Sequence, residues 1–448
     1  MFRKAVLALK EWHARGGRER KPLVIRGARQ VGKSYLVRDF AAQHGLALLE
    51  LNFEKSPEQR KLFTPSETRT LLSVLATHFR QPLGAGALLF LDEIQSAPEV
   101  FSRLRYIHED APHVAVVAAG SLLEFALAEM EHSVPVGRVE YLHLGPMQFE
   151  EFLVARGDNL WLELLRGWTP GDIESQRRLQ AFHEPLLESA RDFGIVGGMP
   201  EAVAHYVERR DFLAVERTHR SILDSFREDF AKYRRRVPLE RLQHLFHQIP
   251  AELGRKWVHA RVEPSARAEV VSAALGALCA ARIAHRVHHS AGNGVPLAAE
   301  RKDRSFKVLF LDVGLASSEL GLGVEHRLRS EALFQVNEGA LAEQWIGQHL
   351  LDLRAIYAAP EVHYWAREKT GAEAEVDYLW AHGPRVVPVE VKSGKSGRLK
   401  SLRVFLEEKR SRLGVRFSTQ PPSLEGSLLH LPIYMVGELP RLVSLLAP

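Results

Sequence analysis

The sequence predicts an α/β protein whose first part is a parallel sheet built around a phosphate-binding loop. Near-continuous apolar runs alternate with segments of helical apolar spacing, which is typical of parallel sheets covered on both faces. Between the first apolar run and the first helical segment lies GARQVGKS, which fits the pattern G-x-x-x-x-G-K-[ST]. Glycines let the backbone wrap a phosphate, and the following helix points unpaired N–H groups at the anion.

The chain divides by its patterning into four segments. Residues 1–145 are expected to form the core around the phosphate loop, and residues 146–236, with a helical period, a helical lid. Residues 237–335 contain a helix followed by two strand-like runs, which indicates a candidate winged-helix segment. Residues 336–448 alternate helix and strand again and are expected to form a second α/β domain.

Composition places the chain among ordinary globular proteins. It has 448 residues, of which 46% are hydrophobic and 26% charged, and a net charge of +5 that favours nucleic acid only weakly. The one cysteine, Cys279, excludes an intrachain disulfide and fits a reducing cytoplasm. We expect no signal peptide and no membrane partner, because no apolar run approaches about 18 residues.

The phosphate loop is set in the context that its mechanism needs. Residues 22–25 are typical of a buried strand, and residues 35–42 have the spacing of a helix. The lysine of the loop would reach the β- and γ-phosphates of ATP, and its serine hydroxyl would bind Mg²⁺. The residues expected to hold the nucleotide are Gly27, Ala28, Arg29, Gln30, Val31, Gly32, Lys33 and Ser34.

Two carboxylates end the apolar strand predicted at residues 87–91. Asp92 can hold Mg²⁺ beside the loop, and Glu93 can orient or deprotonate the attacking water. Ser121 follows the next predicted strand, where its hydroxyl could touch the γ-phosphate or the water. Arg138 is a candidate for stabilising phosphate charge, in this chain or in a neighbouring subunit.

These motifs resemble a family of prokaryotic ATPases of the AAA+ superfamily. Further matches to that family extend the resemblance over nearly the whole chain. The family joins an ATPase module to a C-terminal domain of unknown function that resembles restriction endonucleases, so the resemblance implies ATP binding and hydrolysis. The segments that carry it are residues 26–34, 90–95, 119–121, 145–153, 197–201, 311–315 and 337–344.

A second constellation lies near the C-terminal end of the chain. A predicted hairpin would place Asp377 and Glu390 at one end of a sheet, and the period of two puts Lys392 on the same face as Glu390. Two carboxylates and a lysine can hold Mg²⁺, activate water and stabilise a pentavalent phosphate. The arrangement is similar to the PD-(D/E)XK nuclease pattern, whose first acidic position Glu343 matches. A solvated sheet edge with a surface ion pair is the alternative.

The leading hypothesis is a Mg²⁺-dependent ATPase that couples its nucleotide state to a DNA-directed, nuclease-like module, with DNA favoured over RNA. A ring or other homo-oligomer would allow an arginine to act in a neighbour's site. The alternative is a nucleotide-gated switch whose nuclease-like domain is inactive and serves as a docking platform. Basic residues that could contact a nucleic-acid backbone are Lys232, Arg234, Arg235, Arg236, Lys395, Arg398, Lys400 and Arg403.

Overall fold

The computed structural model describes residues 1–121, 123, 137–233, 237–322, 338–353, 357–367, 374–392 and 399–446. The expected contacts of Arg234, Arg235, Arg236, Lys395 and Arg398 lie outside these residues. The chain separates into two compact units. Unit 1 comprises residues 1–145, 280–282 and 355–359, and unit 2 comprises the remainder.

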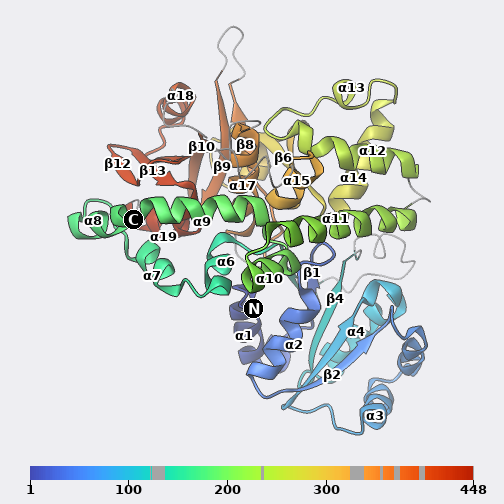
Figure 1. Cartoon of the computed structure of the whole chain (residues 1–448). Helices are drawn as coiled ribbons and strands as arrows, with labels where there is room; N and C mark the ends of the chain where they lie inside the picture. Colours follow the sequence, from blue (N-terminus) through green and yellow to red (C-terminus); the bar gives the residue numbers. More distant parts are fainter. Residues whose placement is uncertain are drawn as a thin grey trace. The chain divides into compact units, whose positions relative to one another are not determined.

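Unit 1 contains the predicted parallel sheet (Figure 1). Its five strands run in the order β2-β3-β4-β1-β5, and every neighbouring pair is parallel. The strands are β1 (Leu23–Arg26), β2 (Ala47–Asn52), β3 (Ala87–Asp92), β4 (Ala115–Gly120) and β5 (Glu140–His143). The helices are α1 (Ala5–Arg15), α2 (Lys33–Gln43), α3 (Thr68–Phe79) and α4 (Pro98–Asp110).

The apolar runs fold as strands because both of their faces can be buried. All six residues of β3 and all six of β4 are buried. Leu71, Leu75, Phe101 and Leu104 of the amphipathic helices α3 and α4 belong to the same core cluster as alternate residues of these strands. Leu89, for example, lies in this cluster. The predicted α/β class of this part is therefore confirmed.

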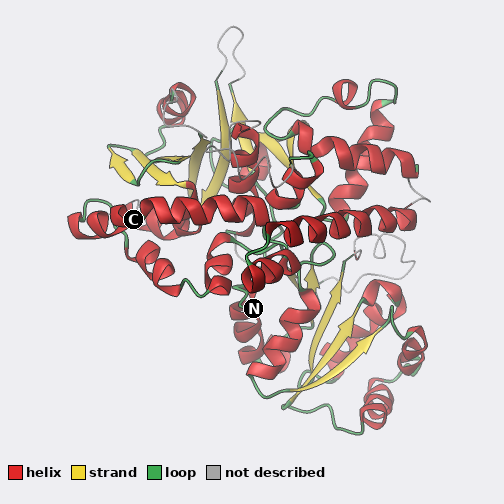
Figure 2. Cartoon of the chain, viewed as in Figure 1, coloured by secondary structure: helices red, strands yellow, loops and turns green. Residues whose placement is uncertain are grey.

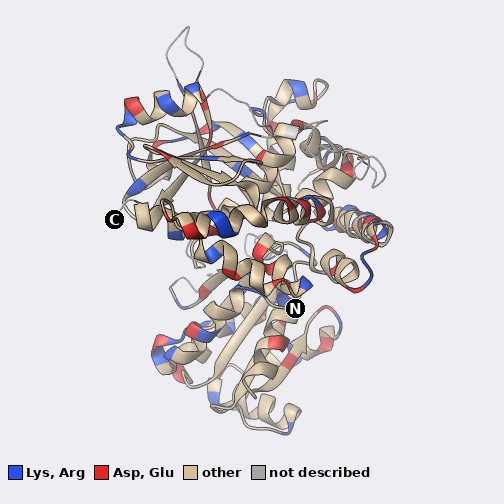
Figure 3. Ribbon diagram, turned by 60° about the vertical axis from the view of Figure 1, so that its left-hand side comes forward, with Lys and Arg blue, Asp and Glu red and all other residues tan. Residues whose placement is uncertain are grey.

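Unit 2 begins with helices alone in its described residues up to 233 (Figure 2). These helices are α6 (Phe149–Arg156), α7 (Asn159–Gly167), α8 (Ile173–Ala181), α9 (His183–Val196), α10 (Pro200–Arg209) and α11 (Phe212–Asp229). They are followed by α12 (Leu239–Gln248), α13 (His259–Val262), α14 (Ala268–Ala280) and α15 (Val313–Glu319). Figure 3 shows residues of both charge signs on the helices of this part of the chain.

The second sheet has eight strands in the order β12-β13-β11-β10-β9-β8-β6-β7. Its strands are β6 (Ala284–Ser290), β7 (Arg301–Phe310), β8 (His363–Ala366), β9 (Glu375–His382), β10 (Arg385–Val391), β11 (Gly414–Ser418), β12 (Ser423–Glu425) and β13 (Leu428–Pro432). The helices around it include α17 (Glu338–Asp352), α18 (Lys400–Lys409) and α19 (Leu439–Leu446). Antiparallel pairs β6–β7, β8–β9 and β9–β10 are combined with parallel pairs β6–β8 and β10–β11.

The candidate winged-helix segment folds differently from an isolated wing. Helix α14 is followed by the antiparallel pair β6–β7, as expected. However, β6 also pairs in parallel with β8, so the two strands extend the C-terminal sheet. The alternating apolar pattern predicts that a segment is a strand, but it does not determine which other strand pairs with it.

A buried aspartate links residues 197–201 with residues 311–315, two segments of unit 2 that carry the family resemblance. Asp312 caps α15 by accepting hydrogen bonds from the backbone N–H groups of Gly314 and Leu315, and it also accepts one from Gly198. Burial raises the pKa of Asp312 to about 6, although these three N–H groups favour its ionised form. A side chain at Gly197 would meet the Asp312 carboxylate, which explains a glycine there.

Candidate functional site

The phosphate loop joins the carboxyl end of β1 to the first turn of α2. Gly27 must be glycine, because a Cβ atom there would lie 2.2 Å from the Leu144 carbonyl oxygen. Gln30 and Gly32 have φ angles of 64° and 91°, so the backbone turns sharply before Lys33 opens the helix. This strand, loop and helix arrangement points backbone N–H groups of the helix N-terminus toward the space that a phosphate would occupy.

Lys33 lies folded into this loop. Its side chain is buried, and Nζ donates hydrogen bonds to the carbonyl oxygens of Gly27 at 3.1 Å and Ala28 at 2.8 Å. These carbonyl groups hold the ammonium where a phosphate would enter. A phosphate oxygen can replace them with a stronger, charge-assisted hydrogen bond.

Ser34 and Asp92 meet beside the loop. Ser34 Oγ donates to Asp92 Oδ2 at 2.8 Å, and Asn52 Nδ2 donates to the same oxygen at 3.1 Å. Burial raises the pKa of Asp92, and the hydrogen bond from Ser34 opposes this shift. A hydroxyl and a carboxylate at this position fit Mg²⁺, which prefers hard oxygen ligands. Asn52 was not singled out in the sequence, because it ends an otherwise ordinary apolar strand.

Glu93 occupies the turn that follows β3. Its backbone is left-handed, with φ of 52°, and its side chain accepts a hydrogen bond from Gln95 Nε2. Gln95 in turn packs against the end of β4, since a Cβ atom at Gly120 would lie 2.5 Å from Gln95 Oε1. A left-handed non-glycine residue is uncommon and frequently marks a functional turn.

Ser121 lies at the carboxyl end of the parallel strands, as the phosphate loop does. Strand β4 pairs in parallel with β1, with Gly120 opposite Arg26, so the residues that follow both strands emerge at one edge. Ser121 is buried, and its Oγ has no hydrogen-bond partner within the described residues. An unpaired buried hydroxyl is costly, which favours a ligand or a water as its partner.

The structure does not bring Arg138 to the phosphate loop of its own chain. Arg138 precedes β5, and Glu140 pairs with Leu23 at the amino end of β1, whereas the loop follows the carboxyl end. Its Nε forms an ion pair with Glu109 Oε1 at 2.9 Å, and the side chain is half exposed. Its catalytic role therefore stays a prediction that requires a neighbouring subunit.

Two other arginines lie near the loop edge instead. Burial, followed by the positive charges of Arg282 and Arg26, lowers the pKa of His143 at the end of β5 to about 4. Arg26 also stacks on Tyr141, with Cζ 3.6 Å from the ring centroid. No sequence pattern could identify Arg282, because it approaches β5 only through the fold of the chain.

In unit 2, the hairpin β9–β10 brings two of the predicted carboxylates together. Tyr378 pairs with Val389, so the neighbouring residues Asp377 and Glu390 lie across the two strands. Asp377 Oδ2 accepts a hydrogen bond from the Val391 N–H at 2.8 Å. Both carboxylates are buried, which does not fit the alternative of a solvated sheet edge.

A lysine that the sequence did not reveal lies among these carboxylates. Lys307 of β7 places Nζ 2.7 Å from Glu375 Oε1, 3.5 Å from Glu343 Oε2 and 3.8 Å from Asp377 Oδ1, and its side chain is only 4% exposed. These negative charges raise the pKa of Lys307 despite its burial. The ammonium lies between Glu343 and Asp377, two of the residues that would hold a divalent cation in a nuclease-like site.

Glu390 and Lys392 form a second ion pair beside these residues. The term carboxylate cluster refers to Glu343, Glu375, Asp377 and Glu390. Lys392 Nζ lies 2.5 Å from Glu390 Oε1, while the buried Glu390 Oε2 has no partner among the described residues. Burial and then Asp377 raise the pKa of Glu390 to about 7. Over the described ranges, no three acidic, histidine or cysteine side chains are arranged to hold a metal. This donor set fits an ammonium better than Mg²⁺.

The carboxylate cluster predicts a pH-dependent stability. Burial first, and then Asp377, raise the pKa of Glu343 from 4.5 to about 8. Between these values the folded chain holds a proton that the unfolded chain has lost, so the free energy of unfolding falls as pH rises from about 5 to about 8. One such proton contributes at most about 1.4 kcal/mol per pH unit. Urea unfolding, followed by tryptophan fluorescence across this range, measures the slope.

Glu343→Gln removes this titration and should make the slope shallower, while the raised pKa values of Glu390 and Asp312 still contribute to what remains. Glu407→Gln on the exposed face of α18 is the matched control and should leave the slope unchanged. A slope that is the same in Glu343→Gln and in the unmodified chain would contradict the assignment.

Comparison with known proteins gives the class of unit 1. Residues 19–153 match the model of an AAA domain. Residues 187–326 and 338–434 match two domains of unknown function, DUF8612 and DUF4143. Together with the parallel sheet and the phosphate loop, the first match supports a P-loop ATPase fold and nucleotide binding for this part of the chain. The likeness of the C-terminal part to restriction endonucleases stays a prediction.

Solved structures resemble the chain only weakly. A Walker-type ATPase of Pyrococcus abyssi is 17% identical, with a TM-score of 0.43, over 71% of this chain and 95% of that one. The ORC2 protein of Aeropyrum pernix is 14% identical, with a TM-score of 0.33, over 73% and 96%. The RuvB Holliday junction branch migration motor of Thermotoga maritima is 16% identical, with a TM-score of 0.27, over 63% and 87%. No curated protein sequence matches.

Among the described helices, none combines the length and the apolar character that a crossing of the bilayer requires.

Proposed function

We propose that the chain is a Mg²⁺-dependent ATPase whose nucleotide state controls a DNA-directed C-terminal module. The observation that carries the proposal is the contact of Ser34 Oγ with Asp92 Oδ2 beside a lysine-bearing phosphate loop. In nucleotide sites Mg²⁺ takes few protein ligands and keeps several waters, so this pair is sufficient. When bound, the ion would neutralise charge that develops on the phosphates.

The remaining residues have distinct roles in hydrolysis. Lys33 exchanges its two carbonyl partners for oxygens of the β- and γ-phosphates. Glu93 orients the attacking water and accepts its proton, while Gln95 holds the Glu93 side chain in place. Ser121 donates its unpaired hydroxyl to the γ-phosphate or to the water. Positioning and electrostatic stabilisation supply most of the rate enhancement in such reactions.

Arg138 supports a homo-oligomeric arrangement within the same proposal. It lies near the amino ends of the parallel strands and is half exposed. The phosphate loop lies at their carboxyl ends, so Arg138 cannot serve the site of its own chain. An arginine in this place can reach the γ-phosphate held by an adjacent subunit, as arginine fingers do. A ring would repeat this contact around its circumference.

The C-terminal module is proposed to contact DNA. Lys392 lies next to the buried carboxylates of the β9–β10 hairpin, and the exposed Lys400 and Arg403 follow on α18. Lysine and arginine side chains neutralise backbone phosphates and release counterions, which makes such binding dependent on salt. ATP binding in unit 1 would then set whether this surface engages DNA.

A second candidate is favoured by Lys307. Its ammonium pairs with Glu343, Glu375 and Asp377, which leaves these oxygens unavailable for a divalent ion. The C-terminal domain would then be an inactive nuclease-like fold that docks DNA or protein without cutting it.

One experiment tests both candidates. The full chain is incubated with duplex DNA and Mg²⁺ or Mn²⁺, with either a non-hydrolysable ATP analogue or ADP, and both binding and cleavage are measured. We expect the affinity for DNA to differ between the two nucleotide states, and we expect no cleavage. Equal affinity in both states would remove the proposed coupling.

The variant Asp377→Ala/Lys392→Ala separates the two candidates. Cleavage by the unmodified chain that this variant loses would establish a nuclease and reject the docking function. Cleavage that persists in the variant comes from a contaminant.

A further inference from the structure

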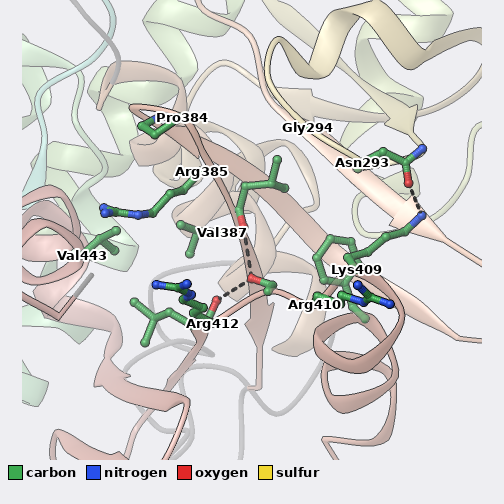
Figure 4. Close-up of a pocket in the computed structure, with 14 residues that line it drawn as sticks. Asn293, Gly294, Pro384, Arg385, Val387, Lys409, Arg410, Arg412 and Val443 are labelled. Carbon is green, nitrogen blue, oxygen red and sulfur yellow. Dashed lines mark hydrogen bonds between the residues drawn. The ribbon is translucent and has the colours of Figure 1, made fainter. Parts of the chain in front are cut away.

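We propose that a basic pocket at the turn end of the β9–β10 hairpin binds the phosphate group of a small phosphorylated ligand. The pocket has a volume of about 270 Å³ (Figure 4). Four cations line it, together with an apolar floor that includes Val387 and Val443. The four are Arg385, Lys409, Arg410 and Arg412, and the term basic pocket refers to the cavity that they line.

The cations come from strand β10, from the end of α18 and from the connection between α18 and β11. Arg385 opens β10, Lys409 and Arg410 end α18, and Arg412 lies between α18 and β11. Figure 4 shows Arg385 and Arg412 toward one side of the pocket and Lys409 and Arg410 toward the other. A helix C-terminus favours cations and accounts for the two residues on α18, but it does not account for the other two.

No acidic residue lines the pocket among those that the structure describes. Neither Arg410 nor Arg412 forms an ion pair with any described residue. Four cations on two sides of one small cavity raise its electrostatic potential. An anion is attracted to such a cavity, and guanidinium groups match the oxygens of phosphate in bidentate geometry.

One wall of the pocket is held in place by hydrogen bonds. Asn293 donates its backbone N–H and its Nδ2 to the two carboxylate oxygens of Glu300, at 3.0 and 2.8 Å. Asn293 Oδ1 then accepts from Lys409 Nζ at 2.7 Å. This chain fixes the ammonium of Lys409 and leaves two of its three donors for a ligand. A cation that is already positioned loses less entropy when it binds.

The size and lining of the pocket define the ligand class. Pockets for drug-sized molecules have volumes of about 300–1,000 Å³, so this one takes a phosphate with a compact organic part. The organic part would lie on the apolar floor. Phe405 also lines the pocket and is buried. A mononucleotide and the terminal phosphate of a nucleic-acid strand share this chemistry.

The basic pocket is distinct from the carboxylate cluster. The turn between β9 and β10 lies at Gly383 and Pro384, whereas Asp377 and Glu390 lie near the opposite end of the same hairpin. A phosphate group bound in the basic pocket would therefore not reach the carboxylate cluster. The proposal does not depend on hydrolysis of ATP or on cleavage of DNA.

Site-resolved arginine labelling tests the proposal. The full chain is treated with phenylglyoxal, and the modification of each arginine is quantified by peptide mass spectrometry with and without ligand. The probes are AMP and a 5′-phosphorylated oligonucleotide, each compared with NaCl at equal ionic strength. We expect protection of Arg385, Arg410 and Arg412. Protection by AMP identifies a mononucleotide site. Protection by the 5′-phosphorylated oligonucleotide, but not by AMP or by the same oligonucleotide with a 5′-hydroxyl end, identifies a strand-end site.

Internal controls decide whether the protection is specific. Arg267 and Arg304 are exposed and do not line the pocket, so their labelling should not change. Equal protection of these two arginines, or no protection of the pocket arginines beyond that given by NaCl, would overturn the proposal. Because the readout is local, binding at the phosphate loop does not affect it.

A pair of variants provides the second measurement. In Arg410→Gln/Arg412→Gln, the ligand concentration that half-protects Arg385 should rise about tenfold or more, because hydrogen bonds to a charged group are lost. The matched control Arg267→Gln/Arg304→Gln removes the same charge outside the pocket and should leave that concentration unchanged. The same shift in both double variants would reject a site at this pocket.

Discussion

Replacing Lys33 with alanine will weaken ATP binding by at least about 100-fold, which corresponds to the loss of two or more charge-assisted hydrogen bonds. The ammonium is already buried inside the phosphate loop, where the carbonyl oxygens of Gly27 and Ala28 hold it. No other described lysine lies in the loop, so no neighbour can take its place. Titration with a fluorescent ATP analogue in the presence of Mg²⁺ measures the loss.

Two further variants make the result specific. Lys10→Ala removes an exposed lysine from α1 of the same unit and should bind ATP as the unmodified chain does. Lys33→Arg keeps the charge but replaces a compact ammonium with a planar guanidinium, and it should also bind poorly. Normal binding and hydrolysis by Lys33→Ala would reject the assignment of the loop.

The phosphate loop could be predicted because all of its parts are contiguous in the sequence. The strand, the glycine turn and the helix follow one another, so local patterning is sufficient to recognise them. The position of Asp92 and Glu93 could also be predicted, because an apolar run that ends in carboxylates places them at the carboxyl end of the strands, where the loop lies. The meeting of Asp92 with Ser34 follows from the parallel strand order.

The residues that were missed are brought to their sites by tertiary pairing. Asn52 reaches Asp92 because β2 pairs with β3, and no local signal distinguishes it from other strand ends. Lys307 lies on a strand whose apolar neighbours predict burial, but the sequence does not indicate which carboxylates it will meet. The partner of a strand depends on the whole sheet, and the period of two carries no such information.

Lys307 also changes how the C-terminal carboxylates are interpreted. From spacing alone, Asp377, Glu390 and Lys392 suggest a metal site, and the structure does bring the first two together. A buried ammonium added to that set neutralises charge that a metal would otherwise neutralise. Removing one partner of a buried ion pair typically costs about 3–5 kcal/mol, so the ammonium is an integral part of the fold.

Replacing Glu93 with glutamine will leave ATP binding within about twofold but lower the turnover number by at least about 100-fold, since general bases contribute 10²–10⁴-fold. Glutamine has nearly the same shape and still accepts a hydrogen bond from Gln95, so the left-handed turn after β3 should persist. What it lacks is a charge to orient water and a site to take its proton. Phosphate release and analogue binding, measured on one preparation, separate the two effects.

The matched control for this variant is Glu99→Gln, which neutralises an exposed carboxylate at the start of α4. It should bind and hydrolyse ATP as the unmodified chain does. Turnover that survives in Glu93→Gln would mean that another group prepares the water, and the unpaired hydroxyl of Ser121 would then be the next residue to replace. A joint loss of binding and turnover would instead assign Glu93 to holding the loop, because a base that acts only in the transition state leaves binding intact.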